Sequence, residues 1–227
     1  MKIRFSTKNV ILIITYILIF AGGIYYKTPI YRLLPLFISV VVMILQSEAD
    51  RFGYLLGSIN ALLYSIVYAG LGLYATAASA FFLSVPIQFM TFVNWKRHAF
   101  GKTVVFKKMT FCARILVGLG TAAVCAIVIF VLNLSGSDYA LFDTLASVLG
   151  ILVSLLTMLG YIEYSYIWPV SSLTSLFLSA QVIMHEMSQM PYFVYALYSF
   201  YCVIAATLNV RKYYKLQNSQ GDEMNME

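Results

Sequence analysis

Long apolar stretches separated by short polar breaks run along almost the whole chain. A helix that crosses the hydrocarbon core of a bilayer needs about 20 consecutive, mostly apolar residues. By this measure the pattern predicts eight transmembrane helices, at residues 8–26, 32–47, 52–72, 75–95, 111–134, 140–160, 164–184 and 191–213. Most of the breaks between them are too short to hold a folded domain, so we expect the function to reside between the helices.

The amino-acid composition indicates a membrane protein and excludes several other classes. Hydrophobic residues make up 61% of the 227 residues and charged residues only 11%, whereas an ordinary soluble domain carries about 25% charged residues. Such a chain has too few polar side chains to cover the surface of a soluble domain. The composition therefore excludes a soluble enzyme, a disordered protein and a coiled coil, and it predicts a single membrane domain over residues 1–227.

The positive charge of the chain, +6 in total, is concentrated on one side of the predicted bundle. With eight helices, only Lys27 and Arg32 of the 15 basic residues fall on the opposite side. Because basic loops stay in the cytoplasm, this pattern predicts an inner (plasma) membrane protein with both termini cytoplasmic. Membrane topology therefore explains the net positive charge, and we do not expect the chain to bind nucleic acid. Residues 215–227 become a cytoplasmic tail, which we expect to be disordered from Gln217 onward.

The same short sequence pattern occurs at the ends of the fourth and eighth predicted helices. Each end has a serine, an asparagine ten residues later, one spacer and two basic residues. In the fourth helix these are Ser84, Asn94, Lys96 and Arg97. In the eighth helix, at an offset of 115 residues, they are Ser199, Asn209, Arg211 and Lys212. With the helix order, this predicts a 3+1+3 plan: an extra N-terminal helix (1–27), a first repeat (31–97), a linking helix (111–134) and a second repeat (140–214). In transporters with such parallel repeats, the substrate site lies at the repeat interface.

Polar and aromatic side chains at helical spacing mark candidate substrate-binding faces, because polar groups in hydrocarbon usually face a cavity or the bundle interior. The candidates are Asn60 and Tyr64 on the third helix, Gln88, Asn94 and Trp95 on the fourth, Trp168 and Ser172 on the seventh, and Tyr198 and Asn209 on the eighth. Each residue type also has a structural alternative. Asparagines cap helix ends, serines bond to their own backbone, and tyrosines and tryptophans form interfacial belts.

The sequence offers no chemistry for catalysis, metal binding or ATP hydrolysis. It contains no Walker loop, HExxH or GxSxG motif, and its acidic residues and histidines lie in loops, at helix ends or in the tail. Cys112, Cys125 and Cys202 lie in apolar stretches, so we interpret them as small buried residues. We therefore predict a protein that is not an enzyme and has no metal or cofactor. Passive transport fits best, because ion-coupled carriers commonly hold ionisable residues at mid-membrane depth.

Scattered positions between residues 50 and 215 carry a resemblance to a known family: Gly57 to Ile66, Leu83 to Gln88, Asn94 to Arg97, Asp143 to Val148, Glu163, Trp168-Pro169 and Asn209. In these positions and in the order of its helices, the chain resembles the nicotinamide riboside transporter family, PnuC. This resemblance implies a SWEET-like bundle of seven helices that often forms trimers. It also implies facilitated diffusion of a vitamin or nucleoside-like substrate, which a cytoplasmic kinase then traps by phosphorylation.

The aromatic and amide side chains determine which substrate we predict. The chain has only Trp95 and Trp168, and it carries Ser165 and Val210 where the family has further tryptophans. We expect uptake of nicotinamide riboside, an NAD precursor, because aromatic faces attract its pyridinium cation and amides or hydroxyls bind its carboxamide and sugar. The alternatives are thiamine, riboflavin or a deoxynucleoside in the same family, a substrate-binding subunit of an ATP-driven vitamin uptake complex, or a structural scaffold.

Overall fold

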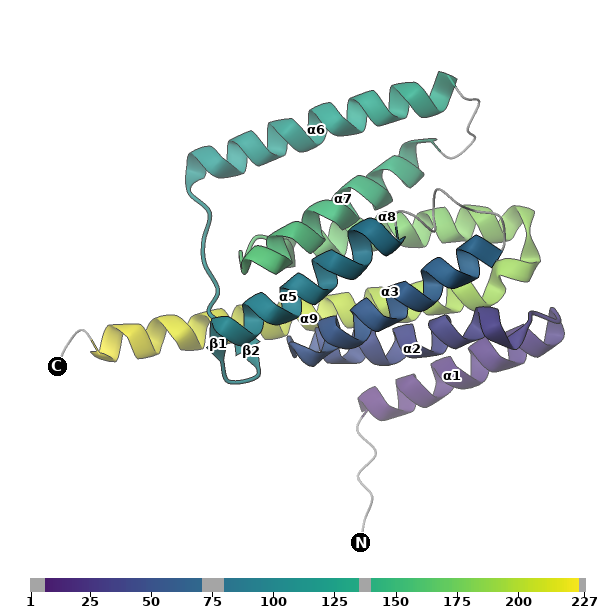
Figure 1. Cartoon of the computed structure of the whole chain (residues 1–227), viewed down its shortest axis with the longest axis horizontal. Helices are drawn as coiled ribbons and strands as arrows, with labels where there is room; N and C mark the ends of the chain where they lie inside the picture. Colours follow the sequence, from purple (N-terminus) through teal and green to yellow (C-terminus); the bar gives the residue numbers. More distant parts are fainter. Residues whose placement is uncertain (1–6, 71–79, 135–139, 225–227) are drawn as a thin grey trace, which may run out of the picture.

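The computed structural model describes residues 7–70, 80–134 and 140–224, and nearly all of these residues are helical (Figure 1). They form eight α-helices: α1 (Thr7–Tyr25), α2 (Ile30–Ser47), α3 (Phe52–Gly70), α5 (Val85–Arg97), α6 (Phe111–Leu134), α7 (Ala140–Leu159), α8 (Tyr164–His185) and α9 (Met190–Met224). A π-helical turn, η1 (Ala80–Ser84), precedes α5, and a 3-10 turn, η2 (Met187–Gln189), precedes α9. Each predicted helix has a counterpart, which confirms the all-α fold. Positions 75–79 of the fourth predicted helix lie outside the described residues.

Several of these helices are long and apolar enough to cross a bilayer. Within the described residues five segments meet both criteria: Ile30–Ser47, Phe111–Val131, Leu141–Leu159, Tyr164–His185 and Met187–Gln220. Shorter apolar segments occupy α1 and α3, at Asn9–Tyr25 and Phe52–Val67. The chain therefore has the helices of a multi-pass membrane protein.

The helices lie side by side, and two sets of three follow the same order of contacts (Figure 1). We call α2, α3 and α5 the first half and α7, α8 and α9 the second half. In the first half α2 packs on α3 and α3 on α5, and in the second half α7 packs on α8 and α8 on α9. The halves meet where α5 contacts α7 and where α9 contacts α2, and α1 packs on α2 and α9. The last helix of each half thus contacts the first helix of the other.

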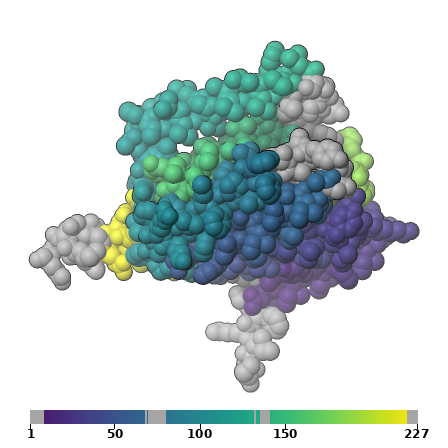
Figure 2. Space-filling model, in the orientation of Figure 1, coloured from purple at the N-terminus to yellow at the C-terminus, as the bar shows by residue number. Residues whose placement is uncertain are grey.

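Helix α6 stands at the edge of the bundle and packs against α7 (Figure 2). A groove of about 360 Å³ separates α6 from α7 and α8, and an ion pair between Arg114 and Glu163, 2.7 Å long, lies among its lining residues. Phe130 on α6 is 64% exposed in the isolated chain, as expected for a surface that faces lipid tails. Cys112 at the start of α6 is exposed, so its predicted burial is wrong, whereas Cys125 and Cys202 are buried.

A short β-hairpin closes the basic end of the bundle, where the sequence predicted only a loop. Strand β1 (Ala99–Phe100) pairs antiparallel with β2 (Thr103–Val104), and Gly101, with φ of 61°, turns the chain between them. We call residues 98–110, which include this hairpin, the strap. The Lys107 N–H donates to the Gly160 carbonyl (2.9 Å), and the Ile162 N–H donates to the Lys107 carbonyl (2.9 Å). These bonds tie the strap to the turn between α7 and α8.

The strap is also bonded to the turn between α2 and α3. The Arg51 N–H donates to the Lys102 carbonyl (3.2 Å), and the Lys102 ammonium lies 2.9 Å from the Glu48 carboxylate. Burial alone would lower the pKa of Lys102, but the hydrogen bond and the charge of Glu48 outweigh it, so the pKa of Lys102 is raised. The strap therefore connects one turn of the first half to the corresponding turn of the second.

The C-terminal extension of α9 is helical to Met224, so the expectation of a disordered tail from Gln217 onward is wrong. The amide of Gln217 donates to the Val104 carbonyl (2.7 Å) and accepts from the Phe106 N–H (2.9 Å). These two bonds fasten the extension to the strap. Composition alone could not reveal them, because the partners are more than a hundred residues apart in sequence.

Four aromatic side chains fill the bundle next to the strap. Tyr54, Trp95, Phe106 and Tyr164, which we call the aromatic plug, belong to one buried cluster. The Trp95 ring lies 4.7 Å from the Tyr54 ring and 5.8 Å from the Phe106 ring, both in edge-on geometry. The plug brings together residues from α3, α5, the strap and α8. Phe106 belongs to the strap, so the plug packs directly against it.

Candidate functional site

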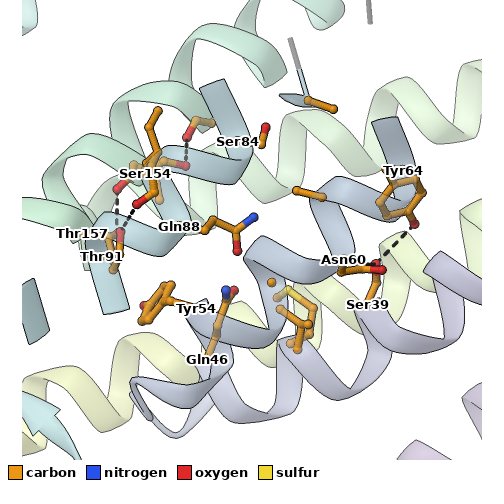
Figure 3. A pocket seen from close by; sticks show the side chains of 18 of the residues that line it. Ser39, Gln46, Tyr54, Asn60, Tyr64, Ser84, Gln88, Thr91, Ser154 and Thr157 are labelled. Atoms are coloured by element: carbon orange, nitrogen blue, oxygen red, sulfur yellow. Dashed lines mark hydrogen bonds between the residues drawn. The ribbon is translucent and has the colours of Figure 1, made fainter. Parts of the chain in front are cut away.

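A cavity of about 430 Å³ lies between the two halves, and Tyr54 of the aromatic plug is among its lining residues (Figure 3). Its polar lining consists of amides and hydroxyls: Ser39, Gln46, Asn60, Ser84, Gln88, Thr91, Ser154, Thr157 and Ser171. Its aromatic lining consists of Tyr54, Tyr64, Trp168 and Tyr195. Because ligand sites combine an apolar surface with a few convergent polar groups, this cavity is the candidate substrate site.

The cavity is electrically neutral. Among the described residues that line it there is no aspartate, glutamate, lysine, arginine or histidine. The described residues also contain no group of three or more histidine, cysteine or acidic side chains that could hold a metal ion. The interior can therefore offer hydrogen bonds and aromatic faces to a ligand, but no counter-ion.

Four of the predicted site residues line this cavity. Asn60 and Tyr64 reach it from α3, Gln88 from α5 and Trp168 from α8. Figure 3 shows Gln88 in the middle of the group, with Ser154 and Thr157 on one side and Asn60 on the other. The helical spacing on α3, α5 and α8 thus brings these four side chains to one space.

The other five predicted residues lie outside the lining. Asn94 donates to the Met158 carbonyl (2.6 Å) and Asn209 donates to the Ser47 carbonyl (2.7 Å), so both amides bind helix ends of the opposite half. Trp95 is fully buried in the aromatic plug, where its Nε1 donates to the Thr157 carbonyl (2.8 Å). Tyr198 donates to the Val40 carbonyl (3.2 Å), and Ser172 is buried on α8 beside Ser171.

Sequence reasoning missed the contributions of α2 and α7. Their lining residues correspond at a constant separation of 111 positions: Ser39 with Gly150, Val42 with Val153, Met43 with Ser154 and Gln46 with Thr157. The same separation relates Gly57 to Trp168 and Asn60 to Ser171 on α3 and α8. The spacing of Ser39, Met43 and Gln46 by four and three residues is the signal that could have revealed this face.

A small hydrogen-bond network fixes the first-half wall. The Ser39 hydroxyl donates to the Pro35 carbonyl (2.9 Å), and Ser39 Oγ accepts from the Asn60 amide (2.7 Å). The Tyr64 hydroxyl lies 3.2 Å from the same Ser39 oxygen. Because the single hydroxyl hydrogen of Ser39 is already donated to Pro35, Asn60 must turn its NH2 group toward Ser39. Asn60 Oδ1 is buried and has no hydrogen-bond partner among the described residues.

Comparison with known proteins places the chain in a family. The family model for nicotinamide mononucleotide transporters matches residues 29–212. The chain belongs to the nicotinamide mononucleotide transporter family. It is therefore a multi-pass membrane transporter and not an enzyme, as the sequence predicted.

A solved structure shows the same fold as this transporter. The crystal structure of the vitamin B3 transporter PnuC is 20% identical in sequence, with a TM-score of 0.73, and the alignment covers 92% of each chain. At this level of identity the likeness concerns the fold alone. The expectation of a PnuC-like helical bundle is thus confirmed. A search of curated proteins gave no match.

Proposed function

We propose that this transporter takes up nicotinamide riboside by facilitated diffusion through the neutral cavity. The absence of any cationic side chain among the described lining residues carries the proposal. A mononucleotide brings a phosphate, and a phosphate in a protein interior is most often bound by arginine, lysine or a metal ion. The riboside lacks that phosphate, so the lining favours it over the mononucleotide.

The remaining chemistry of the cavity suits the riboside. Trp168 and the lining tyrosines offer flat faces on which a pyridinium cation can stack. Gln46, Asn60 and Gln88 supply amides for a carboxamide, and the serine and threonine hydroxyls suit a sugar. The volume of about 430 Å³ lies within the range of roughly 300–1,000 Å³ that small-molecule sites occupy.

We infer alternating access between two parallel repeats as the transport mechanism. The equal contact order of the two halves and the constant separation of 111 positions support repeats at residues 31–97 and 140–214, joined by helix 111–134 and preceded by an extra helix within 1–27. In such transporters one repeat rocks against the other around a central site. The aromatic plug and the strap would then form the closed gate at the basic end.

Localisation and assembly complete the proposal. The strap and the end of α5, which carry many of the basic residues, lie at one end of the bundle (Figure 1). The positive-inside rule makes that end cytoplasmic, with the protein in the inner membrane and both termini in the cytoplasm. The PnuC resemblance further implies a homotrimer and a cytoplasmic kinase that phosphorylates the delivered riboside.

Binding to the purified protein tests the proposal. Calorimetry would compare nicotinamide riboside, its mononucleotide, thiamine, riboflavin and a deoxynucleoside side by side. We expect micromolar binding of nicotinamide riboside and none of the mononucleotide, with binding lost in Trp168→Ala. Binding of another compound alone would mean that this compound, and not nicotinamide riboside, is the substrate. If no compound binds, the transported-vitamin proposal is wrong, and co-purification with an ATPase would indicate a subunit of an ATP-driven complex.

A further inference from the structure

The groove between α6 and the rest of the bundle is separate from the candidate substrate site. It has a volume of about 360 Å³ and is bordered by α6, α7 and α8. Its lining is mostly apolar and includes Val117, Gly118, Leu149, Leu152, Leu156 and Ile167. In a bilayer this groove adjoins the lipid tails. An empty apolar groove would forfeit dispersion contacts, so its surface is suited to an acyl chain.

The charged side chains among the described lining residues lie at the strap end of the groove. Arg114 and Glu163 both line it, and their ion pair balances their charges. The Met109 N–H also donates to the Glu163 carboxylate (3.1 Å), which ties this end to the strap. From Arg114 the lining continues along α6 to Thr121, about 10 Å further, without another charged residue among those described. The groove thus has one polar end and an apolar remainder, like a phospholipid.

Two further cations lie next to this polar end. The Arg211 guanidinium on α9 lies 4.5 Å from the centre of the Tyr166 ring, and Tyr166 lines the groove. Lys108 precedes the lining residue Met109, and its ammonium lies 5.3 Å from the centre of the Tyr214 ring. Neither cation forms an ion pair with a carboxylate among the side chains that the structure describes. Their charge is therefore available to an anion.

The outward face of α9 adds to this positive charge. Its exposed residues recur at helical spacing and border one hollow: Leu208, Arg211, Lys212, Lys215, Leu216 and Ser219. This face combines three cations with two leucines at the end of a membrane-spanning helix, and basic clusters in such positions bind anionic lipid head groups. A second copy of the chain would bring the same positive charge to the groove, so charge complementarity favours the lipid as occupant.

We propose that the groove binds one anionic phospholipid, with an acyl chain between α6 and α8 and the phosphate beside Arg211. Arginine suits this role because its guanidinium forms charge-assisted hydrogen bonds with phosphate oxygens. Lys108 and the basic face of α9 strengthen the positive potential at the same end. The lipid lies against the outside of the second half, away from the neutral cavity, so the inference does not depend on which substrate is transported.

Native mass spectrometry of the purified full-length protein tests the site. The probes are phosphatidylglycerol, which is anionic, and phosphatidylcholine with the same acyl chains, which is zwitterionic. We expect one phosphatidylglycerol to bind at least about tenfold more tightly than phosphatidylcholine, since several basic side chains contribute. Arg211→Gln should weaken phosphatidylglycerol binding about fivefold and leave phosphatidylcholine binding unchanged. Arg97→Gln, which removes an exposed charge at the end of α5, is the control and should change neither.

Two glycines of α6 test the place of the acyl chain. Gly118 lines the groove and Gly120 does not, and a Cβ at either position would meet no atom within 4 Å. Gly118→Phe should fill the groove and lower the affinity for phosphatidylglycerol at least about tenfold. Gly120→Phe, the matched control, should keep the wild-type affinity. Both variants replace a glycine of the same helix by the same residue, so any effect on helix stability is common to both.

Three results would overturn the proposal. They are equal binding of the two lipids by the wild type, equal losses in Arg211→Gln and Arg97→Gln, and unchanged lipid binding in Gly118→Phe. Glycerol 3-phosphate carries a phosphate without acyl chains, and binding of this compound as tight as that of the lipid would assign the site to a free phosphate. A change of oligomeric state in Gly118→Phe without loss of lipid would assign the groove to a second copy of the chain.

Discussion

Asn94 and Asn209 make equivalent hydrogen bonds between the halves, one from the first half to the second and one from the second to the first. Each donates from its amide to a carbonyl in the last turn of a helix of the other half, at Met158 on α7 and at Ser47 on α2. The last carbonyls of a helix lack partners within that helix, so each asparagine satisfies a group that would otherwise be orphaned. The repeated asparagine in the sequence therefore marks a contact between halves, and the observed geometry needs no substrate to explain it.

Replacing these amides should affect stability rather than binding. Asn94→Ala and Asn209→Ala should each cost about 1–2 kcal/mol of unfolding free energy, because a carbonyl at a helix end loses its partner. Thermal unfolding of the purified protein measures this loss, and Asn218→Ala, an exposed change on the same α9 helix, is the control. The dissociation constant of the substrate should change less than about threefold. A loss of affinity of tenfold or more with unchanged stability would instead assign the asparagines to the substrate.

Gly160 ends α7 in a backbone conformation that other residues avoid. Its φ is 75°, and Ala49, which lies 111 positions earlier after α2, has φ of 53°. A Cβ at Gly160 would meet its nearest heavy atom at 3.6 Å, so there is space for a side chain and the cost is backbone strain. Gly160→Ala should therefore destabilise the protein by about 1 kcal/mol in thermal unfolding. Gly120→Ala, in a helical position with open space, should be neutral or slightly stabilising; the same loss in both would refute the strain argument.

At the scale of elements, the strap joins three parts of the fold that are distant in sequence. Its residues bond to the turn after α2, to the turn after α7 and to the extension of α9. The aromatic plug lies directly beneath it, with Phe106 belonging to both. The strap is thus bonded to a turn of each half and to the extension of α9.

The extension of α9 should protect the strap from solvent. Gln217→Ala removes the acceptor of the Phe106 N–H and the donor to Val104. Hydrogen exchange at the Phe106 N–H should then become at least about tenfold faster, since an amide that loses its bond is exposed to water. Gln220→Ala, at an exposed position on the same helix, should leave the exchange unchanged. Equal exchange in the two variants would show that Gln217 does not hold the strap.

The sequence predicted the elements of this fold better than it predicted the strap. Long apolar runs bounded by polar breaks located all eight helices, because burial in a bilayer demands such runs. Strands of two residues such as Ala99–Phe100 are too short to show an alternating pattern. The helix beyond Gln217 depends on partners in the strap, and no local pattern encodes them.

The candidate site was predicted only where polar residues form a stripe along one helix. The stripes on α3, α5 and α8 led to Asn60, Gln88 and Trp168, all of which line the cavity. On α2 and α7 the lining includes apolar residues such as Val42, Met43 and Val153, so the polar stripe is weaker there and was missed. Asn94 was predicted as a neighbour of the α5 stripe, but its position near the helix end directs its amide to the Met158 carbonyl.

At the scale of the whole molecule, the neutral cavity predicts insensitivity to pH. Tyrosines are the only ionisable groups in the described lining, and a tyrosine ordinarily titrates near pH 10. The dissociation constant of nicotinamide riboside should therefore vary less than about twofold between pH 5.5 and 8.5, as measured by calorimetry in buffers of different ionisation enthalpy. Proton release on binding, or a tenfold change in affinity over this range, would contradict the account.

Entrance counterflow in proteoliposomes tests the central claim most directly. Vesicles loaded with unlabelled nicotinamide riboside and diluted into a trace of labelled riboside need no ion gradient and no ATP to exchange the two. We predict a transient accumulation of label inside, which external riboside inhibits and external mononucleotide does not, because the lining offers the phosphate no cationic partner. Absence of accumulation without an added gradient, or equal inhibition by the mononucleotide, would contradict facilitated diffusion of the riboside through this cavity.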